Sequence, residues 1–204
     1  MAGEPASPAP LSVLFVCTGN ICRSPTAERL LRVEADRDGA LAVSSAGTAA
    51  MVGRGIDGPS ARALEQLGVD PTGHVARRLT DELLGSADLV LTAETGHRGA
   101  VLARAPGLLR RTFTMLEFVR LARADGEGFA TGAGVCPADR IAVLAGRRGT
   151  VAPPRPGADD LPDPYGRGQP AADACALATA DACAVVAAVL EGRDPGGAAR
   201  TLAW

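Results

Sequence analysis

The chain has 204 residues, and its 21 basic and 23 acidic side chains give a formal net charge of −2 at pH 7. Every strong cation is Arg, since Lys is absent, and no basic stretch is interleaved with aromatic residues, which argues against nucleic-acid binding. No run of 18 or more apolar residues is present, so we expect no membrane insertion. The length suits one α/β domain with room for an insertion or tails.

The first ten residues, MAGEPASPAP, contain neither a basic region nor an apolar core. We therefore expect residues 1–10 to be a flexible N-terminal leader rather than a signal peptide. The 5 cysteines show no paired spacing, which fits a reducing compartment better than a disulfide framework. Together these features predict a cytoplasmic protein.

A short apolar strand, Leu11–Val16, is followed by Cys17 and then by a helical pattern over Thr26–Glu34. The connecting sequence VCTGNICRSP places Arg23 six positions after Cys17, the Cys-x5-Arg-Ser arrangement of cysteine enzymes that transfer phosphate. Such a loop can wrap one tetrahedral oxyanion, with N–H groups at the helix N-terminus directed into it. We predict a phosphate-binding loop made of Thr18, Gly19, Asn20, Ile21, Cys22, Arg23 and Ser24.

Three residues of this segment, Cys17, Arg23 and Ser24, suit the chemistry of phosphoryl transfer. The helix N-terminus and Arg23 favour the thiolate of Cys17, which would make it a nucleophile. Arg23 offers a planar fork for two phosphate oxygens, and Ser24 offers a hydroxyl to the sulfur. The simpler alternative is that Cys17 only packs, as a small buried apolar side chain at the end of a strand. Two interpretations of Cys22 have equal weight. It forms a reversible disulfide with Cys17 that prevents over-oxidation of the nucleophile, or it is simply a packed side chain.

Further along the chain, short apolar segments alternate with helical patterns. Strands are expected over 41–46, 87–93 and 111–115, and helices over 60–67, 95–105, 116–124 and 170–190, with a short one after Thr80. This alternation predicts an α/β fold, a single doubly wound domain over 11–191 with a four-stranded parallel sheet flanked by helices. Ligands bind beyond the carboxyl ends of such strands, where Cys17 lies. Residues 192–204 are expected to form a C-terminal tail.

Residues 125–161 are rich in Gly and Pro, with a candidate helix over 137–145. We expect a mobile excursion, either a lid or a passive surface loop, and favour the passive loop. The next residues are Leu161-Pro-Asp163-Pro-Tyr165-Gly166. Two prolines restrict the backbone around Asp163, as a carboxylic acid held over a leaving group would require. Taken alone, the segment predicts only a turn.

With VCTGNICRSP near its N-terminus and DPYG near its C-terminus, the chain resembles the low-molecular-weight protein tyrosine phosphatases. The resemblance runs from about Leu11 to Glu191, apart from the excursion. It implies that Cys17 is the nucleophile, Arg23 the phosphate clamp and Asp163 the general acid and base, with a phosphocysteine intermediate and no metal or other cofactor. It also implies a polar network that holds the loop, made of Asn20, Ser24, Ser45 and His74.

The resemblance also bears on the substrate. Arginine phosphatases of the family place Thr after the Asn, so Ile21 favours phosphotyrosine, in a pocket walled by Ile21, Met51 and Tyr165. Met51 stands where many members have an aromatic residue, as in bacterial members linked to exopolysaccharide tyrosine kinases. The expected partner is a tyrosine-phosphorylated protein, with a cognate tyrosine kinase among the candidates. The alternatives are a protein arginine phosphatase, a small-molecule phosphatase of the same fold, and a non-catalytic phosphoprotein-binding module.

Overall fold

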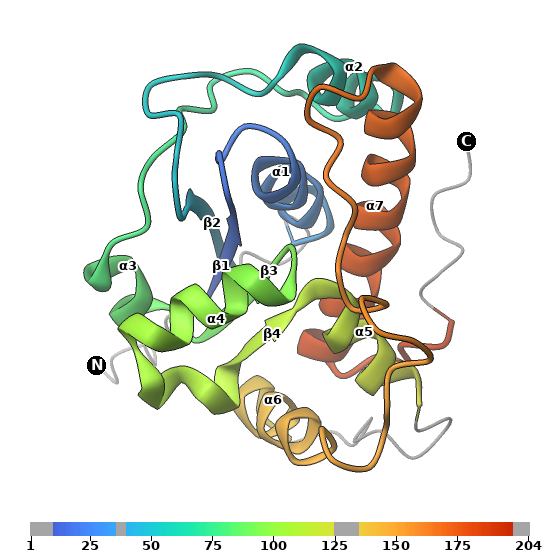
Figure 1. Ribbon diagram of the computed structural model, residues 1–204. Coiled ribbons are helices and arrows are strands. Elements are labelled where there is room, and N and C mark those ends of the chain that lie inside the picture. The colour runs from blue at the N-terminus through green and yellow to red at the C-terminus, as the bar shows by residue number, and fades with distance from the viewer. Residues whose placement is uncertain (1–9, 36–39, 125–134, 198–204) are drawn as a thin grey trace, which may run out of the picture.

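The computed structural model describes residues 10–35, 40–124 and 135–197. The predicted leader up to residue 9, the first part of the excursion (125–134) and residues 198–204 of the tail lie outside the described residues. Figure 1 shows a sheet at the centre of the molecule with helices packed around it.

Four parallel strands form one sheet in the order β2-β1-β3-β4. They are β1 (Leu11–Cys17), β2 (Leu41–Gly47), β3 (Leu89–Thr92) and β4 (Thr112–Thr114). The predicted doubly wound fold with a four-stranded parallel sheet is therefore confirmed. Cys17 pairs with Gly47 and Val16 pairs with Thr92, so three strands end at one edge of the sheet, where the loop after β1 begins.

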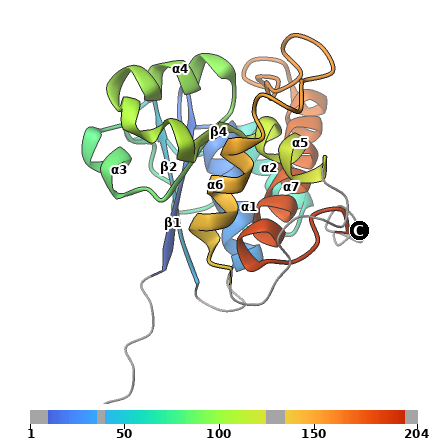
Figure 2. The same ribbon diagram turned by 90° about the horizontal axis from the view of Figure 1, so that it is seen from below.

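Alternate residues of β1 enter two separate cores. Val13 and Phe15 belong to the larger one, and Leu14 and Val16 to the smaller one. The larger core is covered by α1 (Arg23–Ala35), α2 (Gly58–Gln66), α5 (Met115–Arg123), α6 (Pro137–Gly146) and α7 (Gln169–Glu191). The smaller is covered by α3 (Asp81–Ser86), α4 (Thr95–Arg104) and the 3₁₀ helix η1 (Pro106–Arg111). Figure 2 shows these two layers on opposite faces of the sheet.

Helix boundaries follow local signals. Thr80 caps α3 and Thr114 caps α5, the latter in a reciprocal capping box with Glu117. Helix α1 begins at Arg23, as expected, and Pro25 lies in its first turn, where N–H groups have no helical partner and a proline is tolerated. By length and composition α7 could cross a membrane, but most of it is buried within this domain.

The described part of the predicted excursion, residues 135–161, is held against the domain. Ile141 and Leu144 of α6 are buried in the larger core. Arg148 lies over the Phe113 ring, 4.1 Å from its centroid, and its Nε donates to the Glu117 carboxylate at 2.9 Å. Apolar burial and a shielded ion pair therefore fix a segment whose composition alone suggests a loose loop.

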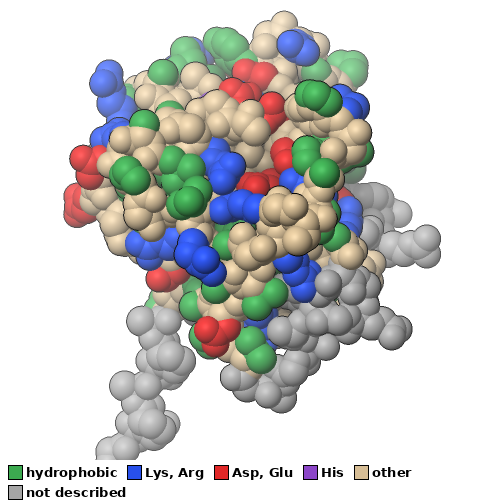
Figure 3. All heavy atoms as spheres, turned by 60° about the horizontal axis from the view of Figure 1, so that its bottom comes forward, with side chains coloured by type: hydrophobic (Ala, Val, Ile, Leu, Met, Phe, Trp, Pro, Cys, Tyr) green, Lys and Arg blue, Asp and Glu red, His purple; other side chains and the backbone are tan. Residues whose placement is uncertain are grey.

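The surface carries both signs of charge. On the face in Figure 3, Arg side chains lie beside acidic ones, with hydrophobic side chains scattered between them. Exposed pairs such as Arg104 with Asp81, 2.8 Å apart, connect neighbouring elements. Because such pairs each contribute about 1 kcal/mol or less, the two cores rather than the surface charges hold the fold together.

Gly47, the last residue of β2, touches the loop after β1. A Cβ at this position would lie 2.4 Å from the Thr18 carbonyl oxygen and 3.1 Å from Ala50 Cα. We expect Gly47→Ala to lower the free energy of unfolding by about 1–3 kcal/mol, measured by urea denaturation, because rigid backbone must move. Gly99→Ala in α4 is the control: its Cβ would meet no heavy atom within 4 Å, so stability should stay the same or rise by up to about 1 kcal/mol. Equal stability of Gly47→Ala and the wild type would contradict the close approach.

Candidate active site

The loop after β1 turns its carbonyl groups outward. The carbonyl oxygens of residues 17–21 each accept a hydrogen bond from outside the loop, and the donors are Thr48, Ala49, Met51, His74 and Asp57. In a trans peptide the N–H points opposite to the C=O. The N–H groups of residues 18–22 are therefore directed to the inner side, and within the described chain none of them donates a hydrogen bond. A loop of this kind is a cradle for an anion.

Asn20 is the hub that holds the loop in this shape. It has a φ of +54°, a left-handed conformation that Asn tolerates better than most residues. Its Nδ2 donates to Ser24 Oγ at 2.9 Å and to Ser45 Oγ at 2.8 Å, and its Oδ1 accepts from the Arg77 N–H at 2.9 Å. His74 Nε2 lies 2.7 Å from the Asn20 carbonyl oxygen. The structure thus brings together all four residues of the predicted network.

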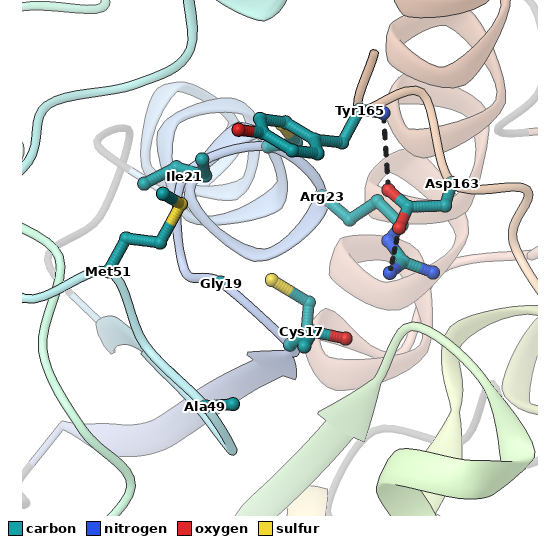
Figure 4. A pocket seen from close by; sticks show the side chains of 10 residues that line it. Cys17, Gly19, Ile21, Arg23, Ala49, Met51, Asp163 and Tyr165 are labelled. Carbon is teal, nitrogen blue, oxygen red and sulfur yellow. Dashed lines mark hydrogen bonds and ion pairs between the residues drawn. The ribbon is translucent and has the colours of Figure 1, made fainter. Parts of the chain in front are cut away.

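The Cys17 sulfur lies on the inner side of the loop. It is 3.0 Å from Ser24 Oγ, and the whole residue is only 2% exposed. Figure 4 shows the sulfur directed into a pocket, with Arg23 and Asp163 on one side and Ile21 and Met51 on the other. Cys22 lies in the same loop, and its burial raises the pKa of its thiol to about 12. It therefore carries its proton at neutral pH and packs against Ile21 and Ala76.

Arg23 is 2% exposed and binds three groups from distant parts of the chain. Its Nη1 donates to Glu94 Oε2 at 2.8 Å and to the Leu161 carbonyl at 3.3 Å, and its Nη2 lies 3.1 Å from Asp163 Oδ2. Burial opposes the charge, but the hydrogen bond with Glu94 and the nearby acidic groups raise the pKa of Arg23. Its Nε is buried with no hydrogen-bond partner in the described chain, a donor still available to an anion.

The pocket above Cys17 has a volume of about 240 Å³. Ile21, Met51 and Tyr165, the residues proposed as the wall of a substrate pocket, line it together with Ala49. Asp163 stands at the rim, where its Oδ1 accepts from the Tyr165 N–H at 3.3 Å. The structure therefore gathers five of the seven predicted loop residues, the proposed acid and the proposed wall residues around one opening (Figure 4), while Asn20 and Ser24 belong to the polar network that holds the loop.

Two residues of the site escaped the sequence analysis. Glu94 follows β3 and pairs with Arg23, while His97, one turn into α4, places its Nε2 2.8 Å from Thr18 Oγ1. His97 Nε2 is also 3.6 Å from Glu94 Oε1. The position of Glu94 at the carboxyl end of a central strand was a usable signal, because such ends share one edge of the sheet.

Across the described residues, no group of three or more His, Cys, Asp or Glu side chains is placed to hold a metal ion.

Comparisons with known proteins agree on one family. Residues 12–127 match the model of the family described as low molecular weight phosphotyrosine protein phosphatase. The low molecular weight protein-tyrosine-phosphatase Etp of Escherichia coli K12 is 43% identical over 101 residues, 50% of this chain and 66% of Etp. The match therefore spans just under two thirds of Etp, and the family segment ends before Asp163.

Solved structures extend the likeness to most of the fold. The low molecular weight protein tyrosine phosphatase from T. tengcongensis superposes with a TM-score of 0.63 at 27% identity, covering 85% of this chain and 95% of that one. The YwlE arginine phosphatase from Geobacillus stearothermophilus superposes almost as well, with a TM-score of 0.62 at 26% identity, covering 85% and 88%. Overall shape therefore does not separate the two activities.

His97 supplies a test of the site's electrostatics. Its burial lowers its pKa, and the opposing attraction of Glu94 does not reverse this direction. Below about pH 6.5 the unfolded chain takes up a proton that the folded His97 resists, so the free energy of unfolding should fall as the pH falls. We expect urea unfolding at pH 7.5 and 5.5 to show a steeper loss for the wild type than for His97→Gln, by at most about 1.4 kcal/mol per pH unit. Parallel losses would show that His97 does not resist protonation.

Proposed function

Because the chain belongs to the low molecular weight phosphotyrosine protein phosphatase family, we propose that it hydrolyses phosphotyrosine in proteins through a phosphocysteine intermediate. The observation that carries the proposal is the geometry of the loop after Cys17. Its carbonyl groups accept hydrogen bonds from residues outside the loop, and its N–H groups point to the inner side, where the Cys17 sulfur lies. Donors arranged in this way stabilise the equatorial oxygens of a phosphoryl group while charge moves in the transition state.

In the first step the Cys17 thiolate attacks phosphorus, an S–P bond forms, and the P–O bond to the tyrosine ring breaks. Ser24 donates a hydrogen bond to the sulfur across the 3.0 Å contact, which stabilises the thiolate. Arg23 binds two phosphoryl oxygens, one of them through the unpartnered Nε. The phosphoryl group displaces the Asp163 carboxyl from Nη2, and the protonated carboxyl then donates its proton to the departing phenolate oxygen.

In the second step Asp163 acts as a base. It accepts a proton from a water molecule, whose oxygen attacks phosphorus and breaks the S–P bond, so that inorganic phosphate forms and Cys17 returns to the thiolate. Because Asp163 is at the rim of the pocket, the same carboxyl can face the leaving group first and the water afterwards. This chemistry requires no cofactor.

The apolar wall supports an aromatic substrate. Ile21, Met51 and the half-exposed Tyr165 flank the opening above Cys17, and together they suit the faces of a phenyl ring better than a guanidinium group. The proposed substrate is accordingly a tyrosine-phosphorylated protein, and a cognate tyrosine kinase is one candidate. The 5 cysteines are all free, which supports a cytoplasmic location, testable by cell fractionation.

The decisive measurement is phosphate release from an aryl phosphate and a tyrosine-phosphorylated peptide in the presence of EDTA. We expect turnover by the wild type, none by Cys17→Ser, and a rate about 10²–10⁴-fold lower for Asp163→Ala, the range typical of a lost general acid. Asp194→Ala serves as a control for carboxylate removal, because Asp194 is exposed and belongs to a turn after α7. Its rate should equal that of the wild type.

Other outcomes would select another function. Faster release from phosphoarginine or a sugar phosphate than from phosphotyrosine would identify an arginine phosphatase or a small-molecule phosphatase. Tight binding of the phosphopeptide by the wild type without turnover would identify a binding module. Loss of activity in EDTA would refute the metal-free mechanism.

A further inference from the structure

Residues 159–161 cross the carboxyl ends of β3 and β4 immediately before the proposed acid, and we name this segment the strap. The Leu161 N–H donates to the Ala93 carbonyl at 2.8 Å, and Thr114 Oγ1 donates to the Asp159 carbonyl at 2.6 Å. Asp160 Oδ1 accepts from the N–H of Thr95, the first residue of α4, at 2.7 Å. The strap is thus hydrogen-bonded to both strand ends and to α4.

Arg120 on α5 provides the charged anchor of the strap. Its Nε and Nη2 donate to the two carboxylate oxygens of Asp159 at 2.8 and 2.7 Å, a bidentate geometry. Its Nη1 donates to the carbonyl of Val151, an earlier residue of the same long connection. The side chains of Arg120 and Asp159 are only 16% and 15% exposed, so solvent weakens this pair less than a surface pair.

The anchor lies four residues from Asp163, and little freedom separates them. Leu161 is 1% exposed, and Pro162 and Pro164 restrict the backbone on both sides of Asp163. The Leu161 carbonyl also accepts from Arg23 Nη1, which ties the strap to the group that holds the phosphate. A shift of the strap would therefore move the Asp163 carboxyl relative to a leaving group bound above Cys17.

We propose that Arg120 is a positioning residue for the general acid: by binding Asp159 it holds the strap and so sets the place of the Asp163 carboxyl. The inference rests on the proposed function, because it assigns no reaction of its own. Arg120 itself lines no part of the pocket. Its effect should appear only in the step where Asp163 transfers a proton.

The test compares aryl phosphates whose leaving groups range from dinitrophenol, a weak base that departs without a proton, to phenol and tyrosine. We expect Arg120→Met to lower kcat/KM for phenyl phosphate and phosphotyrosine by about 10–10²-fold, the scale of a catalytic group displaced by about 1 Å. Its kcat/KM for dinitrophenyl phosphate should stay within about twofold of the wild type, because that reaction hardly needs the acid. Asp163→Ala should show the same dependence on the leaving group, more steeply.

Arg123→Met is the matched control. Arg123 lies on the same helix and pairs with Asp181 at 2.8 Å, away from the pocket, so its loss should leave every kcat/KM within about twofold of the wild type. Inhibition by inorganic phosphate checks that the loop around Cys17 is intact, and Arg120→Met should retain the wild-type inhibition constant. If Arg120→Met does not fold, Asp159→Asn removes the same ion pair with less change in shape and should show the same leaving-group dependence.

The outcomes separate the two proposals. Equal kcat/KM losses for all leaving groups, or no loss, would show that the Arg120–Asp159 pair is purely structural and would overturn the inference. The proposed function would still stand in that case if Asp163→Ala remained slower than the wild type. A wild type that hydrolyses none of the aryl phosphates would overturn both. Non-additive effects of Arg120→Met and Asp159→Asn on the phenyl phosphate reaction would support the inference, and additive effects would oppose it.

Discussion

The buried guanidinium of Arg23 is the constraint on which the rest of the site depends. A cation that is 2% exposed costs several kcal/mol unless other groups solvate and neutralise it. Glu94 supplies a charge from the start of α4, and Leu161 and Asp163 supply a carbonyl and a second carboxylate from the connection to α7. One permanent charge thus draws together three segments that lie far apart in the sequence. Arg23 Nε has no hydrogen-bond partner among the described residues, which leaves it as a donor for one more acceptor.

The loop beside Arg23 has a shape that its own residues could not maintain alone. Asn20 holds a left-handed conformation, and its amide is satisfied by Ser24, Ser45 and Arg77. Ser45 in turn donates to Glu28 Oε2 at 2.5 Å, which extends the network into α1. Buried polar networks of this kind rigidify a site when every member is satisfied. The rigidity keeps the inward N–H groups in place before any anion arrives, which is the condition for electrostatic stabilisation of a transition state.

The described part of the connection between α5 and Asp163, residues 135–161, is held more firmly than its composition alone indicates. Its many Gly and Pro residues predict a loose excursion, yet Ile141 and Leu144 are buried and Arg148 pairs with Glu117. A few well-placed side chains suffice, because a single buried apolar residue contributes about 1.5–3 kcal/mol whatever the composition around it. The same connection delivers Asp163 to the pocket, so its packing belongs to the working part of the molecule.

Local sequence determined much of this protein. The apolar runs predicted all four strands, the alternation predicted the parallel sheet, and the spacing of Cys17, Arg23 and Ser24 predicted the loop, because periodicity and short loops are encoded by neighbouring residues. Only the tertiary structure decided that Glu94 binds Arg23, that His97 meets Thr18 and that Arg120 holds Asp159. These partners are 71, 79 and 39 positions apart, and no local pattern specifies which charged side chain will meet which across such separations. Packing of the helices against the sheet makes that choice, because it sets which side chains are buried together and must neutralise one another.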